Sequence, residues 1–237
     1  MLDKSTYREL KKKVLIEESY EEMLEIDSSF LRFSPHPYES LGAPYEGRSP
    51  FFLRKTVLEK LHKAQKKLDA ITNGYRLKIF DAYRPLSVQK FMIDYDIKRM
   101  ASEIFGSDFE SLDTKQQNQV KDTVTHFWSP ISKNVALNPP PHSTGAALDL
   151  TIVDANGVEL NMGTKIDELK EESSADYYKN SHKIYEKNRQ LLVNVMSAAG
   201  FIQLPTEWWH FSYGDQIWAV DFASKHKTEI NAQYGMV

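Results

Sequence analysis

Residues 141–149 read Pro141-His142-Ser143-Thr144-Gly145-Ala146-Ala147-Leu148-Asp149, and a second stretch reads Glu207-Trp208-Trp209-His210. Together they supply two imidazoles, an aspartate and a further glutamate. A catalytic zinc site takes three nitrogen or oxygen ligands from the protein and leaves the fourth position for water. A free carboxylate beside that water completes the machinery for hydrolysis. The two stretches can therefore build a catalytic zinc site.

The spacing of the first stretch predicts its local structure. Residues 148–153 alternate between two sets of side chains, which indicates a strand. His142 and Asp149 are seven residues apart, an odd separation that would place them on opposite faces of one regular strand. We therefore expect His142 on a loop and Asp149 on the strand that follows. Gly145 suits the turn between them, because glycine adopts backbone conformations that other residues avoid.

The second stretch needs an irregular backbone for the same reason. Glu207 and His210 are three residues apart, so a straight strand would separate them. Pro205 lies just upstream and favours an irregular approach to the strand. We expect Glu207 to face the metal water from the loop and His210 to bind the metal from the strand. The neighbouring residues Trp208, Trp209 and Phe211 are expected to wall the site.

Spacing alone leaves another interpretation open. A lone histidine near a proline loop is usually a surface or hydrogen-bonded residue, and an aspartate at a strand entrance is a common structural feature. On composition and spacing the zinc site is a hypothesis, and no substrate follows from it. The remaining histidines show no comparable neighbours: His36, His62, His126, His182 and His226.

Composition narrows the class of protein. The chain has 237 residues, a net charge of -3 and no basic block beyond Lys11–Lys13, which we interpret as a solvated helix face. This balance gives no electrostatic reason to expect nucleic acid as a partner. No cysteine is present, so a metal must be held by histidine or carboxylate. The charged N-terminus and the lack of a stretch of roughly 20 apolar residues predict a protein without a membrane span that acts in the cytoplasm.

Hydrophobic periodicity predicts an α+β domain with a mainly antiparallel sheet. Residues 103–124 are expected to form a peripheral helix or loop. We expect residues 1–237 to form a single domain, on which the proline- and aromatic-rich residues 1–52 pack as an arm. Helices are expected over about 53–70, from Ser87 onward and over 181–199, and strands over 75–80, 148–153, 201–204 and 208–213.

Further matches extend the pattern to a known family. The order His, six residues, Asp, then Glu-x-x-His resembles the zinc D-alanyl-D-alanine peptidases of the hedgehog-like fold. The dipeptidase branch, which includes the vancomycin-resistance dipeptidases, shares Glu-Trp-Trp-His and a strand ending in Asp-x-Tyr-Arg-Pro, here Asp81-Ala82-Tyr83-Arg84-Pro85. The segment 162–167 is similar to the family's Met-Gly-x-x-Phe-Asp. The resemblance runs from about Phe52 to Phe222.

The resemblance implies a role for each matched residue. It makes His142, Asp149 and His210 the ligands of one zinc ion per chain. It makes Glu207 the general base. It implies that Arg84 stabilises the oxyanion. In the substrate site it assigns the ammonium to Asp167, and places Asp81 as a carboxylate that holds the arginine.

The resemblance also implies a function, with one departure from the family pattern. Pro140 stands where family members often carry a serine that contacts substrate. The leading hypothesis is a zinc dipeptidase that hydrolyses D-Ala-D-Ala or a similar D,D-dipeptide in cell-wall precursor metabolism. One alternative is a carboxypeptidase or endopeptidase acting on longer peptidoglycan stems, and another is a non-catalytic zinc or peptide-binding module. The sequence leaves the oligomeric state open.

Overall fold

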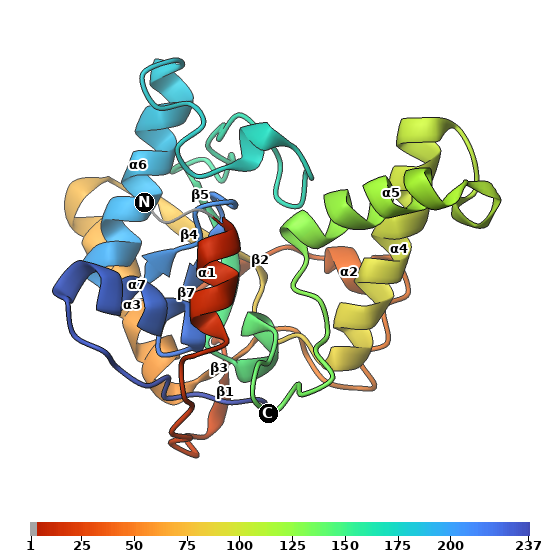
Figure 1. Cartoon of the computed structure of the whole chain (residues 1–237). Coiled ribbons are helices and arrows are strands. Elements are labelled where there is room, and N and C mark those ends of the chain that lie inside the picture. Colours follow the sequence, from red (N-terminus) through yellow and green to blue (C-terminus); the bar gives the residue numbers. More distant parts are fainter. Residues whose placement is uncertain (1–3) are drawn as a thin grey trace.

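The computed structural model describes residues 4–237 and is built around a five-stranded sheet (Figure 1). The strand order is β2-β4-β5-β7-β6. The pair β2 and β4 is parallel, whereas the other neighbouring strands are antiparallel. A separate two-stranded sheet pairs β1 with β3. The predicted α+β class with a mainly antiparallel sheet is confirmed.

The elements of the described chain have the following bounds. The strands are β1 (Met23–Glu25), β2 (Leu31–Arg32), β3 (Phe52–Arg54), β4 (Arg76–Asp81), β5 (Ala147–Val153), β6 (Ile202–Gln203) and β7 (His210–Ser212). The α-helices are α1 (Lys4–Lys11), α2 (Pro37–Ser40), α3 (Lys55–Ile71), α4 (Leu86–Phe105), α5 (Thr114–Phe127), α6 (Lys183–Ala198) and α7 (Gln216–His226). Three short 3₁₀ helices are η1 (Phe109–Ser111), η2 (Pro141–Thr144) and η3 (Glu171–Ser173).

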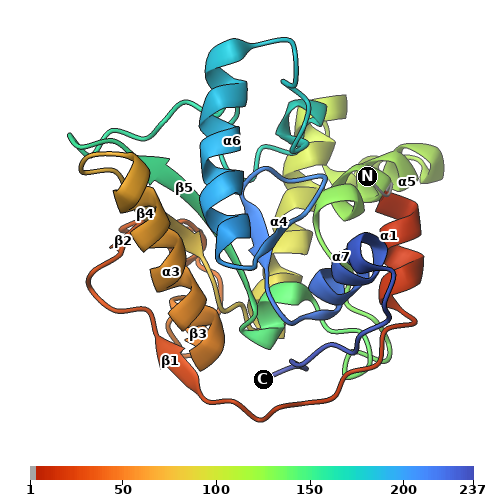
Figure 2. The same cartoon turned by 90° about the vertical axis from the view of Figure 1, so that its left-hand side faces the viewer.

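Helices α3 and α6 lie side by side against the sheet (Figure 2). Helix α3 forms because its apolar residues recur at helical spacing, and Val57, Leu61 and Leu68 on that face are fully buried. They pack with Leu77 and Ile79 of β4 in the main apolar core. This core makes the sheet a rigid support for the side chains at its other end.

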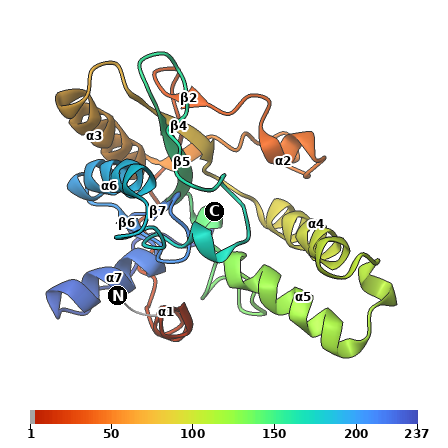
Figure 3. The same cartoon turned by 90° about the horizontal axis from the view of Figure 1, so that it is seen from above.

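Helices α4 and α5 form a hairpin that projects from the sheet (Figure 3). Helix α5 begins with a capping box, in which the Asp113 side chain accepts from the backbone N–H of Gln116 and the Gln116 side chain accepts from that of Asp113. A second apolar cluster lies between the two helices and includes Tyr38 and Trp128. The polar residues 103–124, expected as one peripheral helix or loop, are instead divided among the end of α4, η1 and α5.

The N-terminal residues contribute to both sheets. Residues 4–52 contain α1, β1, β2 and α2, so the proline-rich arm has more regular structure than expected. Ile16 forms a backbone bridge with Ala232, and the backbone N–H of Val237 donates to the carbonyl of Ser143 at 3.0 Å. We therefore propose that the arm is an integral part of one domain. Residues 1–3 of the expected arm lie outside the described residues.

Several boundaries differ from the predicted ones. Pro85, and not Ser87, occupies the N-cap position of α4, and the Ser87 hydroxyl donates to the carbonyl of Pro44. Helix α7 was not anticipated from the periodicity. Gly200 follows α6 with φ of 97°, as expected for the end of that helix. Among residues 4–237, no helix combines the length and the apolar character that crossing a membrane requires.

Candidate metal centre and substrate cavity

Three neighbouring strands bring the central side chains together. In the sheet register Asp81 of β4 lies opposite Asp149 of β5, which in turn lies opposite His210 of β7. His142 reaches the same place from η2, just before β5. Gly145 joins η2 to β5 with φ of 70°, and a Cβ there would collide with the Met23 side chain. The expected loop and strand positions of His142 and Asp149 are therefore found.

The three predicted ligands converge. His142 Nε2 and His210 Nδ1 are 3.1 Å apart, and His210 Nδ1 lies 3.1 Å from Asp149 Oδ1. His142 Nε2 lies 3.3 Å from Asp149 Oδ2. All three residues are buried. They form a group that can hold a metal ion with one atom from each.

Hydrogen bonds behind the ligands fix which ring nitrogens face the centre. His142 Nδ1 donates to the carbonyl of Ala82 at 2.8 Å, which leaves its Nε2 as an acceptor. The hydroxyl of Ser212 donates to Asp215 at 2.9 Å and so accepts from His210 Nε2 at 3.3 Å. His210 Nδ1 is then also an acceptor. Such partners orient metal-binding histidines and select their tautomers.

This donor set fits zinc. The lone pairs of two imidazole nitrogens and a carboxylate face one another. A cation placed between them makes this arrangement favourable. Zinc binds such atoms at about 2.0 Å, and two ligands of a tetrahedral ion are then roughly 3.3 Å apart. The observed separations of 3.1–3.3 Å, in which His210 faces Oδ1 of Asp149 and His142 faces Oδ2, are close to this spacing. Asp149 also has a lowered pKa, because His142 and His210 outweigh the effect of its burial.

Arg84 lies beside the metal centre in a network of fixed partners. Its Nε donates to Asp81 at 2.9 Å, its Nη1 to Gln89 at 3.1 Å and its Nη2 to the hydroxyl of Tyr38 at 3.1 Å. The indole of Trp128 covers the guanidinium at 4.7 Å from the ring centroid. Although burial opposes its charge, Tyr38, Asp81 and other acidic neighbours raise the pKa of Arg84. The cation is therefore held rigidly and permanently charged.

Asp81 lies behind Arg84 and not against the cavity. It is fully buried and does not line the cavity described below, but it accepts a hydrogen bond from Arg84, the contact that the resemblance implied. Its Oδ1 lies 3.3 Å from Nε2 of His36, a histidine that sequence reasoning dismissed. Burial opposes ionisation of Asp81, but Arg84 and His36 more than compensate and lower its pKa. Asp81 is thus a positioning residue for the arginine.

Asp167 lies at the edge of the site, close to Arg84. It lines the cavity with a left-handed φ of 62°, and Tyr38 donates to its Oδ2 at 2.6 Å. Burial, together with the charge of Asp149, raises the pKa of Asp167 to about 8. A cation that approached this carboxyl would favour its ionised form.

Glu207 occupies the turn before β7. The backbone N–H of Glu207 donates to Leu204 at 3.2 Å, and that of His210 donates to Glu207 at 3.3 Å. This turn places Glu207 Oε2 3.9 Å from His210 Nδ1. Of the three aromatic residues expected as walls, Trp209 lines the cavity, whereas Trp208 and Phe211 pack into the main core.

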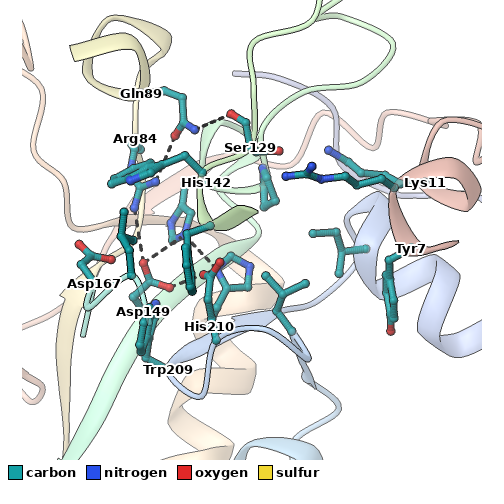
Figure 4. Close-up of a pocket in the computed structure, with 18 residues that line it drawn as sticks. Tyr7, Lys11, Arg84, Gln89, Ser129, His142, Asp149, Asp167, Trp209 and His210 are labelled. Carbon is teal, nitrogen blue, oxygen red and sulfur yellow. Dashed lines mark hydrogen bonds and ion pairs between the residues drawn. The ribbon is translucent and has the colours of Figure 1, made fainter. Parts of the chain in front are cut away.

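A cavity of about 90 Å³ opens over the metal centre, and the described residues around it include groups that sequence reasoning missed (Figure 4). Gln89 and Trp128 reach it from the α4 and α5 region. Arg8 and Lys11 reach it from α1, and Lys11 is only 8% exposed, so its expected place on a solvated face is wrong. The sequence around these residues does not mark them, because α1 contacts residues that lie more than a hundred positions away along the chain.

The family comparison agrees with this site. The model of the D-Ala-D-Ala dipeptidase family matches residues 32–229. A D-alanyl-D-alanine dipeptidase of Synechocystis is 40% identical over 214 residues, which cover 86% of each chain.

The chain belongs to the D-Ala-D-Ala dipeptidase family.

As a member of this family the protein is a zinc metallopeptidase, as the resemblance implied, and family membership with the α+β architecture confirms the expected fold class. A D-alanyl-D-alanine dipeptidase of Escherichia coli is 43% identical over 70 residues, which cover 30% of this chain and 36% of that protein. The LdcB LD-carboxypeptidase structure is similar with a TM-score of 0.45 and 16% identity, covering 89% of this chain and 77% of the other. The family match begins at residue 32, after α1.

Proposed function

We propose that this dipeptidase-family protein hydrolyses D-Ala-D-Ala or a closely related D,D-dipeptide in cell-wall precursor metabolism. The observation that carries the proposal is the zinc-type centre of His142, Asp149 and His210 at the base of a small cavity that also contains Glu207 and Arg84. The cavity has a volume of only about 90 Å³, which favours a short peptide over a long one. The names of the relatives support the same substrate.

Each side chain then has a task in hydrolysis. When bound, zinc supplies a Lewis acid and acidifies water to a pKa of about 7. Glu207 takes a proton from the attacking water as the new C–O bond forms, and then returns it to the departing amine as the peptide C–N bond breaks. Arg84 presents its fixed positive charge to the carbonyl oxygen as negative charge develops there. Asp81 keeps the guanidinium in place.

Asp167 is the proposed partner of the substrate ammonium. Its carboxyl lines the cavity on the side of Arg84 and is held by Tyr38. A free ammonium at this carboxyl would favour its ionised form and form a charge-assisted hydrogen bond. A longer peptide has no ammonium at this point, so Asp167 favours dipeptides over stem peptides.

A steady-state comparison of free D-Ala-D-Ala with a stem pentapeptide tests the proposal. We expect a higher kcat/KM for the dipeptide, because only the dipeptide offers its ammonium to Asp167. Faster cleavage of the pentapeptide would instead favour the carboxypeptidase or endopeptidase function. Absence of turnover on both would favour a binding module. The cytoplasmic location stays a prediction from the sequence.

A further inference from the structure

We propose that Arg8 and Lys11 of α1 bind the free carboxylate of the substrate and so complete its recognition at the end opposite Asp167. This inference rests on the proposed dipeptidase function. It concerns residues that precede the region matched by the family model. It therefore assigns to α1 a specificity role within a site otherwise built by the sheet and the α4 and α5 region.

Arg8 and Lys11 line the same cavity as the metal-binding residues. In Figure 4 Lys11 and Asp167 lie on opposite sides of the view, with Asp149, His142 and His210 between them. A zwitterionic dipeptide has one charge at each end and its scissile carbonyl in the middle. Seated over the metal centre with its ammonium at Asp167, it directs its carboxylate toward α1.

Arg8 and Lys11 each have more hydrogen-bond donors than their contacts with backbone carbonyls use. Lys11 Nζ donates to the carbonyl of Pro139 at 2.7 Å, and Arg8 Nη2 donates to the carbonyl of Thr125. A lysine has three donors and an arginine five. The two groups are therefore anchored by backbone carbonyls while charge remains available for an anion.

The buried charges favour an anion in the cavity. Burial lowers the pKa of Lys11 to about 8; Asp215 opposes this effect and Arg8 adds to it. Burial also lowers the pKa of Arg8, with Glu207 acting against it. Asp215 already accepts from Ser212 and from the first turn of α7, and Glu207 is the proposed base. A buried cation is unfavourable unless an anion accompanies it, and a substrate carboxylate supplies that anion.

The test compares D-Ala-D-Ala with its C-terminal amide, which lacks the carboxylate. Zinc-loaded wild-type protein, R8Q, R8K and K11M are assayed on both compounds. We expect KM for the acid to rise by about tenfold or more in R8Q and in K11M, with a smaller change in kcat and little change on the amide. R8K is expected to fall between wild type and R8Q, since lysine keeps the charge but loses the planar fork.

K12Q is the matched control, because Lys12 follows Lys11 but is exposed and pairs with Glu9 on the surface. Its kinetics should equal those of the wild type. Thermal unfolding and zinc content of each variant show whether folding is intact. R8Q and R8K keep the proposal testable if K11M does not fold.

Binding separates failure of this inference from failure of the proposed function. Calorimetry of D-Ala-D-Ala and its amide is carried out on E207Q and on the R8Q/E207Q double variant. Weaker binding of the acid alone in the double variant supports the carboxylate site, even if the wild type hydrolyses neither compound. Unchanged preference for the acid in R8Q, in both kinetics and binding, overturns the inference and leaves dipeptide hydrolysis standing.

Discussion

Glu207 stands within reach of the metal centre because a turn, and not a strand, precedes β7. Replacing Glu207 by alanine should lower kcat by about 10²- to 10⁴-fold, since the proton of the attacking water loses its acceptor. Zinc content should stay at one ion per chain, because the three ligands are untouched. Steady-state kinetics and elemental analysis measure the two quantities.

E110A is a suitable control, because Glu110 is an exposed acid in η1, away from the cavity. It should keep wild-type activity. An E207A protein that turned over as fast as E110A would contradict the proposed role of Glu207.

The role of a residue can be predicted from the sequence when its partners are close to it along the chain. His142 and Asp149 share one short stretch, and their spacing allows only a loop followed by a strand. Spacing does not reveal that Tyr38 joins Arg84 to Asp167, because these groups are far apart along the chain. His36 was dismissed for the same reason, although it lies beside Asp81.

Helix α1 is the element that carries charge into the cavity. It packs against α7, where the hydroxyl of Tyr7 donates to Asp221 at 3.1 Å. This docking buries Lys11 near Arg8 and Asp215, whose opposing charges both act on its ammonium group. Burial of this positive charge therefore destabilises the folded protein, but the charge is available to interact with a bound substrate.

This energetic penalty depends on pH. Lys11 has a pKa of about 8 in the folded state and an ordinary value of 10.5 when unfolded. Below pH 8 both states hold the proton, and the penalty is complete. Between these values the unfolded state binds more protons, so wild-type stability rises with pH relative to a variant without the amine. The Tm of the wild type relative to that of K11M should therefore rise from about pH 7 to about pH 9.5. A Tm difference that did not change with pH would contradict the buried ammonium.

Helices and strands could be predicted where the hydrophobic periodicity of the sequence is strong. The apolar face of α3 and the alternation in β5 both correspond to elements that the structure contains. Helix α7 was missed because it is apolar around much of its surface, and the strands β1 and β2 were missed because they are only two or three residues long. Such short strands are fixed by the partners they pair with, which local sequence does not show.

At the scale of the whole molecule, a segment near the start of the described chain pairs with one near its end, and the last residue reaches the short helix that carries His142. Residue 16 pairs with residue 232, and the last residue bonds to Ser143 in η2. Metal binding and global stability are therefore coupled, because unfolding separates ligands that lie more than sixty positions apart.

Removal of the metal should lower the Tm. A ligand at a thousandfold excess over its Kd stabilises the folded state by about 4 kcal/mol, which corresponds to roughly 8–16 °C for a domain of this size. Differential scanning calorimetry with and without a chelator measures the shift. H210A should show almost no shift, since it lacks one ligand; a similar shift in H210A and wild type would mean that the metal binds elsewhere.

The central claim is that this cavity hydrolyses a small D,D-dipeptide. The most direct test is kcat/KM of the zinc-loaded protein on the D,D, L,D, D,L and L,L isomers of Ala-Ala. The D,D isomer should be preferred over L,L by about 100-fold, because inversion at either Cα turns a methyl group into the cavity wall or moves a charged end away from its partner. Equal hydrolysis of the four isomers, or hydrolysis of none, would contradict the account.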